Sequence, residues 1–152
     1  MAVGGFDENF SAYGFEDMEV AFRLEDQAGI SFQVLPSPVP LHVHHHTPEQ
    51  YFAKKVECGR YSLPHLARLH PGRIREMHLH HAVDIPGQLA VSGFTTLIRF
   101  LAASSLGRDL PRLLSGWPTL PGQRPLLSPL YYRLMNLAVL CSYRQGVTET
   151  KS

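Results

Sequence analysis

The sequence has little cysteine, little net charge and no long apolar run. Two cysteines, Cys58 and Cys141, supply neither a disulfide framework nor a four-cysteine zinc site, so we expect a reducing, cytoplasmic location. The 14 Lys and Arg residues against 13 Asp and Glu give a formal net charge of +1, which disfavours a general nucleic-acid binder. The most apolar stretch, residues 89–103, contains polar residues and is shorter than the roughly 20 residues that cross a bilayer.

What is present is enough for one domain-sized core, because 44% of the 152 residues are hydrophobic. Apolar residues recur at helical spacing over 15–28, 48–69 (with a kink at Pro64), 73–83, 89–106 and 130–143. Apolar and polar residues alternate over 30–34 and 39–46, which predicts short extended segments. Five prolines predict a connector over about 108–129.

These predictions divide the chain into two parts. The expected strands all precede residue 47, and helices dominate afterwards, so we expect an α/β segment over 1–85 and a mostly helical tail over 86–152. One or two isolated strands do not make a stable sheet by themselves. We therefore expect the first part to belong to a larger sheet whose preceding half is missing from this chain.

The most informative residues are two neighbouring acids, Glu16 and Asp17, at the start of the first predicted helix. A carboxylate at the rim of a cleft can take a proton from a hydroxyl group, which is the work of a general base. Acidic residues in a first helical turn also interact favourably with the helix dipole and cap backbone N–H groups. Spacing alone leaves both interpretations open.

The residues around this pair carry a resemblance. Gly-Gly-Phe-Asp-Glu at 4–8, Tyr-Gly-Phe-Glu-Asp-Met-Glu at 13–19 and Arg-Leu at 23–24 resemble the acceptor-side block of family-2 glycosyltransferases with the GT-A fold. The same block is the core of the galactosyltransferase C-terminal domain. His-x-His at 42–44, Lys-Lys at 54–55, Gly-Arg at 59–60 and His-Pro at 70–71 extend the resemblance over roughly the first half of the chain. It implies the acceptor-side part of an α/β fold with few short strands.

The resemblance also implies roles for individual residues. Asp17 is expected to be the catalytic base and Glu16 a contact to the acceptor of the sugar. A divalent metal ion, Mn or Mg, is expected in the complete enzyme, with His42 as the best matching ligand and His44 second. The remaining expected substrate contacts, some of them beside the donor sugar or its diphosphate, are Gly4, Gly5, Asp7, Lys54 and Arg60.

Two features of such enzymes are missing. The chain contains no Asp-x-Asp motif and no nucleotide-binding half before the block. We therefore expect a separate N-terminal half or another partner polypeptide, no sugar transfer by this chain alone, and weak metal binding at most. The expected reaction of the complete enzyme moves a sugar from a nucleotide-sugar to a saccharide, lipid-linked or other hydroxyl acceptor, with inversion.

Rival interpretations come from other classes of protein. The chain could be a non-catalytic module that docks on a partner protein or, peripherally, on the inner face of the cell membrane. It could also be a small His-rich metal-binding protein, since residues 44–46 are three consecutive histidines. His78 and His81 lie one helical turn apart, which fits either a shared zinc ion or a solvated helix face.

Overall fold

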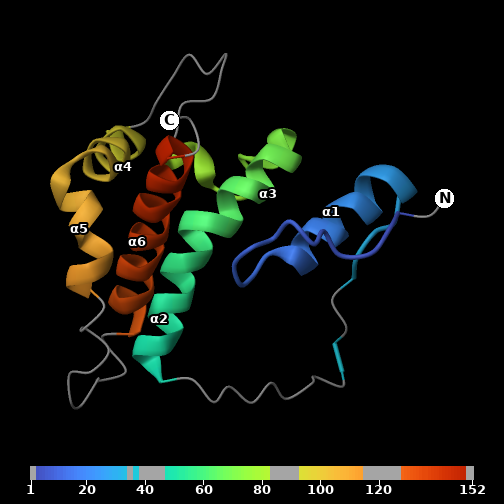
Figure 1. The fold of residues 1–152 in the computed structure, drawn as a ribbon, viewed down its shortest axis with the longest axis horizontal. Helices are drawn as coiled ribbons and strands as arrows, with labels where there is room; N and C mark the ends of the chain where they lie inside the picture. Colours follow the sequence, from blue (N-terminus) through green and yellow to red (C-terminus); the bar gives the residue numbers. More distant parts are fainter. Residues whose placement is uncertain (1–2, 34–35, 38–46, 83–92, 115–127, 150–152) are drawn as a thin grey trace.

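The computed structural model describes residues 3–33, 36–37, 47–82, 93–114 and 128–149. These residues are mostly helical and contain no strand (Figure 1). The helical tail that the sequence predicts is therefore present, whereas the short strands are not formed in the described part of the chain. The elements in chain order are α1 (Glu16–Ala28), α2 (Pro48–Glu57), η1 (Cys58–Ser62), α3 (Leu63–Leu69), η2 (Pro71–Arg73), η3 (Leu79–His81), α4 (Gly93–Ala103), α5 (Ser105–Leu114) and α6 (Ser128–Glu149).

Helix α1 matches the predicted helix over 15–28 almost residue for residue. It ends at Gly29, whose φ of 64° places the backbone in the left-handed region that glycine adopts without strain. The N–H of Gly29 bonds to the carbonyl of Glu25, which satisfies one of the last carbonyls of the helix. Residues 30–33 then form no strand, and Ile30 and Phe32 are exposed, because no neighbouring strand offers them a pairing edge in the described residues.

The predicted helix over 48–69 is a continuous column of three pieces. Thr47 begins it with a capping box, in which its side chain and that of Gln50 each bond to the other's backbone N–H. The irregular part is the π-helix η1, where the N–H of Leu63 bonds to the carbonyl of Cys58, five residues back. Pro64 lies in the first turn of α3, directly after the π-helix, and the helical column continues through it.

Three other predicted elements differ from the structure. The helix expected over 73–83 is replaced by the short 3-10 helices η2 and η3, with His78 in the left-handed region between them at a φ of 57°. The helix expected over 89–106 is divided at Ser104 into α4 and α5. Helix α6 extends to Glu149, beyond the predicted end at residue 143. The segments over 39–46 and 115–127 lie outside the described residues.

Helix α5 also runs into the predicted proline-rich connector, since Pro111 lies inside it. Proline has no N–H, so the carbonyl of Gly107, four residues earlier, loses its helical partner. The side-chain amide of Gln145 on α6 donates to this carbonyl at 3.4 Å. The neighbouring helix thus replaces the bond that the proline removes.

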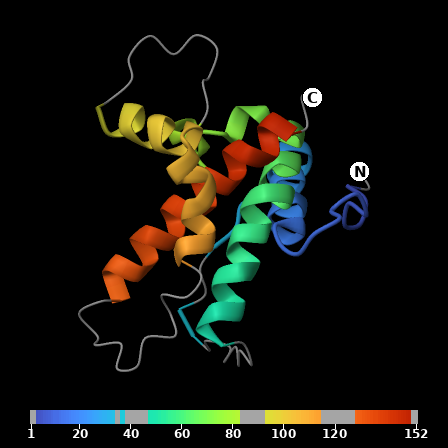
Figure 2. The same ribbon diagram turned by 60° about the vertical axis from the view of Figure 1, so that its left-hand side comes forward.

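Helix α6 is the centre of the helical part. It lies between the α2–η1 column on one side and α4 with α5 on the other (Figures 1 and 2). Glycines permit the close approach: a Cβ at Gly59 would stand 2.7 Å from the carbonyl oxygen of Val139, and one at Gly146 would overlap the carbonyl oxygen of Arg60. In the described part of the chain, no helix is long and apolar enough to cross a membrane.

Two clusters of buried side chains join the predicted halves. In the first, Phe22 of α1 and Leu66 of α3 pack in the same cluster as Tyr143 of α6. In the second, Phe52 of α2 packs with Met135 and Ala138 of α6. Residues from 1–85 and from 86–152 therefore share both clusters.

Candidate functional site

The glycine-rich loop at the start of the chain is attached to α1 by Arg23. The guanidinium group donates from Nη2 to the carbonyl of Gly5 at 2.6 Å and from Nη1 to the carbonyl of Val3. The same group is held by Glu19, whose two carboxylate oxygens lie 2.7 and 2.9 Å from Arg23 Nε. Glu19 is only 2% exposed, so this pair is a buried structural contact that fixes the loop on the helix.

A histidine joins α1 to the end of α3. His70 Nε2 lies 3.3 Å from Glu19 Oε1, and its ring meets the ring of Phe22 edge-on, with centroids 5.2 Å apart. The Arg73 guanidinium also lies 4.4 Å from the centroid of that phenyl ring and bonds to Asp26 at 2.6 Å. Glu19 and His70 therefore belong to the packing of α1.

Asp7 of the Gly-Gly-Phe-Asp-Glu motif is bonded to α3. Its Oδ2 lies 2.8 Å from His65 Nε2, and its Oδ1 accepts the N–H of Asn9 at 3.0 Å. His65 Nδ1 lies 3.1 Å from Arg68 Nη2, which can only donate, so the histidine Nε2 carries the hydrogen that bonds to Asp7. These bonds, that of His65 first, lower the pKa of Asp7 from 3.8 to about 2.

The segment before α1 is fixed from the π-helix. Cys58 Sγ donates to the carbonyl of Tyr13 at 2.8 Å, and Ser62 Oγ donates to the carbonyl of Ala12 at 3.2 Å. Gly14 and Phe15 follow with φ angles of 96° and 76°. A phenylalanine in this region costs roughly 1–3 kcal/mol, and such strain gathers at functional sites.

Glu16 and Asp17 come directly after this strained turn. Asp17 is exposed, and its Oδ1 accepts the N–H of Met18 at 2.8 Å, so it satisfies one backbone donor at the start of α1. Glu16 is half-buried, and its Oε2 is shielded from water with no hydrogen-bond partner in the described part of the structure. The capping interpretation therefore applies to Asp17, and Glu16 has an oxygen left to accept a bond.

The two expected basic contacts lie in different places. Lys54 Nζ is 4.4 Å from the centroid of the Tyr13 ring, beside the segment that leads to Glu16 and Asp17. Arg60 instead pairs with Glu149 near the end of α6, with contacts of 2.6 and 3.2 Å. Gly4 and Gly5 are exposed on the loop that Arg23 holds.

A pocket of about 250 Å³ lies between the motif loop, the π-helix and the end of α6. Amide, hydroxyl, guanidinium, imidazole, aromatic and carboxylate groups line it, from Asn9, Ser11, Arg60, Tyr61, His65, Arg68 and Glu149. A second pocket of about 580 Å³ is also lined by Arg60 and Glu149. Neither Glu16 nor Asp17 lines either pocket. The first pocket offers hydrogen bonds and an aromatic ring to a small polar ligand.

The expected metal ligands His42 and His44 lie outside the described residues. The ring centroids of His80 and His81 are 4.0 Å apart and those of His78 and His81 are 6.4 Å apart, while His81 Nδ1 lies 2.8 Å from Thr95 Oγ1. Burial, with the nearby histidines and arginines, lowers the pKa of His80. No group of three His, Cys, Asp or Glu in the described ranges is placed to hold a metal ion.

Several residues of this region were given no individual role from the sequence. Glu19 and Arg23 stand four residues apart, which is the spacing of a helical ion pair, but spacing gives no sign that the pair is buried. His65 and His70 both lie beside carboxylates and pack against phenylalanine rings. Cys58 and Cys141 are both buried, and burial raises the pKa of Cys141 to about 11.

Comparison of the chain with known protein families, with curated proteins and with solved structures finds no match. A function is therefore inferred from the chemistry and placement of these residues.

Proposed function

We propose that this chain is the acceptor-side part of a nucleotide-sugar-dependent glycosyltransferase of the α/β GT-A class. The observation that supports it is the division of labour among the motif acids. Asp7 and Glu19 are bonded to His65 and Arg23 and hold the loop, whereas Asp17 is exposed at the start of α1. A base must reach the substrate, so Asp17 is the one of these three acids whose exposure suits catalysis.

In the proposed reaction, Asp17 takes the proton of the acceptor hydroxyl. The hydroxyl oxygen forms a bond to the anomeric carbon of the donor sugar from the side opposite the leaving group. The bond from that carbon to the diphosphate oxygen breaks, and the nucleoside diphosphate leaves with the electron pair. Inversion follows, and a positioned base contributes typically about 10²–10⁴-fold to such a step. Glu16, the neighbour of Asp17 at the start of α1, is proposed to contact the acceptor.

The donor nucleotide is proposed to be bound by a separate half or a partner polypeptide. A divalent Mn or Mg ion would neutralise diphosphate charge there, and His42 or His44 is the proposed ligand from this chain. The described residues offer no three-ligand set, so weak metal binding is expected of the chain alone.

The first test is acceptor binding, because it does not need the donor half. Saturation-transfer NMR with a panel of mono- and oligosaccharides is expected to detect binding that weakens in Glu16→Gln and Asp17→Asn. Asp109→Asn, an exposed acid on α5, is the matched control and should bind as the unchanged protein does. If no saccharide in the panel binds, or if both site variants bind as the unchanged protein does, the proposal of an acceptor site at Glu16 and Asp17 is wrong.

The second test is catalysis in a complete enzyme that contains this segment. Asp17→Asn is expected to reduce sugar transfer by about 10²–10⁴-fold while donor binding stays nearly intact. Donor affinity that falls as steeply as the rate would assign Asp17 a structural role at the start of the helix. The chain alone should release no nucleoside diphosphate from a nucleotide-sugar above background hydrolysis.

A further inference from the structure

The turn that leads into α1 departs from two local preferences of the backbone. Gly14 and Phe15 have left-handed φ angles of 96° and 76°, in a region that glycine adopts readily and phenylalanine does not. Phe15 is also the N-cap of α1, a position where Ser, Thr, Asp or Asn usually bonds to a free backbone N–H. The local sequence explains Gly14 but not Phe15, so contacts from elsewhere in the chain hold this turn.

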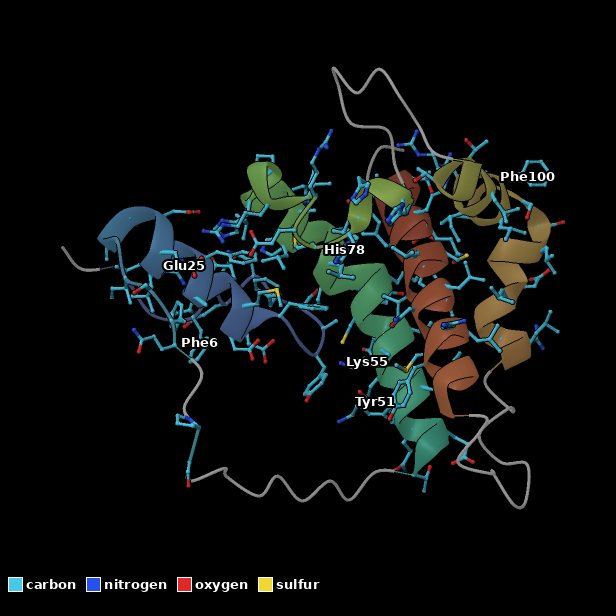
Figure 3. The ribbon with its side chains drawn as sticks, turned by 180° about the vertical axis from the view of Figure 1, so that it is seen from behind. Phe6, Glu25, Tyr51, Lys55, His78 and Phe100 are labelled. Atoms are coloured by element: carbon cyan, nitrogen blue, oxygen red, sulfur yellow. The ribbon has the colours of Figure 1, made fainter. Side chains whose placement is uncertain are left out.

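These contacts come from the π-helix η1, toward which the segment before α1 reaches (Figure 3). Cys58 Sγ donates to the carbonyl oxygen of Tyr13 at 2.8 Å. Ser62 Oγ lies 3.1 Å from the same oxygen and 3.2 Å from the carbonyl oxygen of Ala12. The Cys58 and Ser62 side chains are buried, with residue exposures of 3% and 2%, so water does not compete for these bonds. Because the Tyr13 carbonyl belongs to the planar peptide unit that leads into the turn, bonds to it fix how the chain enters the turn.

The π-helix is itself irregular, and it connects the turn to α6. Toward the turn, a Cβ at Gly14 would stand 2.8 Å from Cys58 Sγ, so the approach leaves no room for a side chain there. Toward α6, Gly59 and Gly146 let the backbones of η1 and α6 approach closely. Single-turn π-helices occur frequently at functional sites. Here an irregular helix and a strained turn meet directly before the two candidate acids of α1.

We propose that Cys58 and Ser62 are positioning residues of the acceptor site, which hold the strained turn and thereby the orientation of the two acids at the start of α1. They donate to backbone carbonyls and take no part in the chemistry. Without them, Phe15 is expected to return to a negative φ, because a residue with a Cβ is most stable there. The first turn of α1 then changes its orientation. This role rests on the proposed acceptor function, whereas the hold on the turn is measurable without it.

The hold on the turn is tested by NMR spectroscopy of the full chain. A residue with a left-handed φ gives a strong nuclear Overhauser effect between its own amide and α protons, because the two protons lie close together. The double variant Cys58→Ala, Ser62→Ala is expected to lose this signal at Phe15. The matched control is Cys141→Ala, Ser142→Ala, which makes the same substitutions at buried residues of α6, where the Ser142 hydroxyl bonds to a carbonyl of its own helix. The control should keep the signal at Phe15.

The effect on the site is tested by binding of the same proteins to a saccharide that the unchanged chain binds. The variant Cys58→Ala, Ser62→Ala should bind about tenfold more weakly, because only the molecules in which the turn is restored can bind. Cys58→Ser keeps a donor and should bind more tightly than Cys58→Ala does. The control double variant should bind as the unchanged protein does. Urea denaturation checks that each variant is folded, and Ser62→Ala alone serves in both measurements if the double variant does not fold.

The proposal is overturned if Phe15 keeps its left-handed signal in the variant without the two donors, or if that variant binds saccharide as the unchanged protein does. An equal loss of binding in the control would also overturn it, because the loss would then come from damage to the core. If the unchanged chain binds no saccharide, the acceptor site is wrong and the positioning role is wrong with it. Binding that is present but insensitive to Cys58 and Ser62 rejects the positioning role alone.

Discussion

At the scale of single residues, the charges that matter most for stability are buried around Glu19. Its carboxylate is 2% exposed and is bonded by Arg23, with His70 near by. Removing one partner of a buried pair leaves an uncompensated charge, which costs far more than the net value of the pair. Glu19 and Arg23 therefore act as a unit that connects the helix to the glycine-rich loop.

We predict that Arg23→Met lowers the free energy of unfolding by about 3–5 kcal/mol, because Glu19 then stays buried without its guanidinium partner. Urea denaturation measures it. The double variant Glu19→Gln, Arg23→Met should recover part of the loss, and Arg75→Met, at an exposed arginine, is the control. A loss below about 1 kcal/mol in Arg23→Met would show that the carboxylate is solvated or has another partner.

A second prediction at this scale concerns pH. The pKa of Asp7 is lowered from 3.8 to about 2, so its contribution to stability is complete above the unfolded value. It is lost as pH falls through the folded value. Acid unfolding of Asp7→Asn should therefore be less steep between pH 3.8 and pH 2 than that of the unchanged protein. Asp109→Asn should keep the steep decline. Equal slopes in all three proteins would show that the contact with His65 does not lower the pKa of Asp7.

At the scale of elements, the crossing of α6 and the π-helix depends on glycine. Gly146 has room for a hydrogen atom but not for a side chain, because a Cβ there would overlap the carbonyl oxygen of Arg60. Gly59 approaches α6 in the same way, against the carbonyl of Val139. The two glycines let the backbones of η1 and α6 touch, which brings Arg60 to Glu149 beside the pocket.

We predict that Gly146→Ala destabilises the protein by about 1–3 kcal/mol, although alanine favours a helix by about 1 kcal/mol over glycine. The steric overlap outweighs the propensity, because backbone atoms cannot move aside as side chains can. Thermal unfolding followed by circular dichroism measures the change. Gly72→Ala, where an added Cβ meets nothing within 4 Å, is the control. A more stable Gly146→Ala protein would mean that the helices are farther apart.

At the scale of the whole molecule, α6 holds together parts that are far apart in sequence. Its Tyr143 belongs to the same cluster as Phe22 and Leu66, and its Met135 and Ala138 pack with Phe52 in the other cluster. The first half of the chain thus completes its core with side chains from the second half. Burial of each large apolar side chain contributes roughly 1.5–3 kcal/mol, so losing the side chains that α6 supplies removes a large part of the roughly 5–15 kcal/mol that stabilises a native protein.

We therefore predict that a fragment of residues 1–85 does not unfold cooperatively. Without Met135, Ala138 and Tyr143, its two clusters lose their α6 side and its apolar surface faces water. Urea titration followed by far-ultraviolet circular dichroism should show a broad, non-sigmoidal change, whereas residues 1–152 should give one transition. A sharp transition in the fragment would support an independent domain that ends near residue 85.

How much of the fold the sequence predicts depends on the range of the interactions involved. The bounds of α1 follow from a local apolar stripe, acids in its first turn and Gly29 after its last. The capping box at Thr47 is equally local. The division between α4 and α5 at Ser104 and the helix around Pro111 do not follow from local sequence. The helix around Pro111 relies on a hydrogen bond from Gln145 of a distant helix. The candidate base Asp17 could be named from the motif, whereas the pocket beside the motif loop could not.

The sequence by itself determined which residues carry acid, base and apolar character, and the periodicity that makes most of the chain helical. Only the tertiary structure decided which acids are bonded and which are exposed. Asp7, Glu19 and Asp17 are the same kind of group in the sequence, and their differences come from His65, Arg23 and solvent. The physical reason is that burial and charge pairing depend on neighbours far away along the chain, whereas helix formation depends on residues within a few positions.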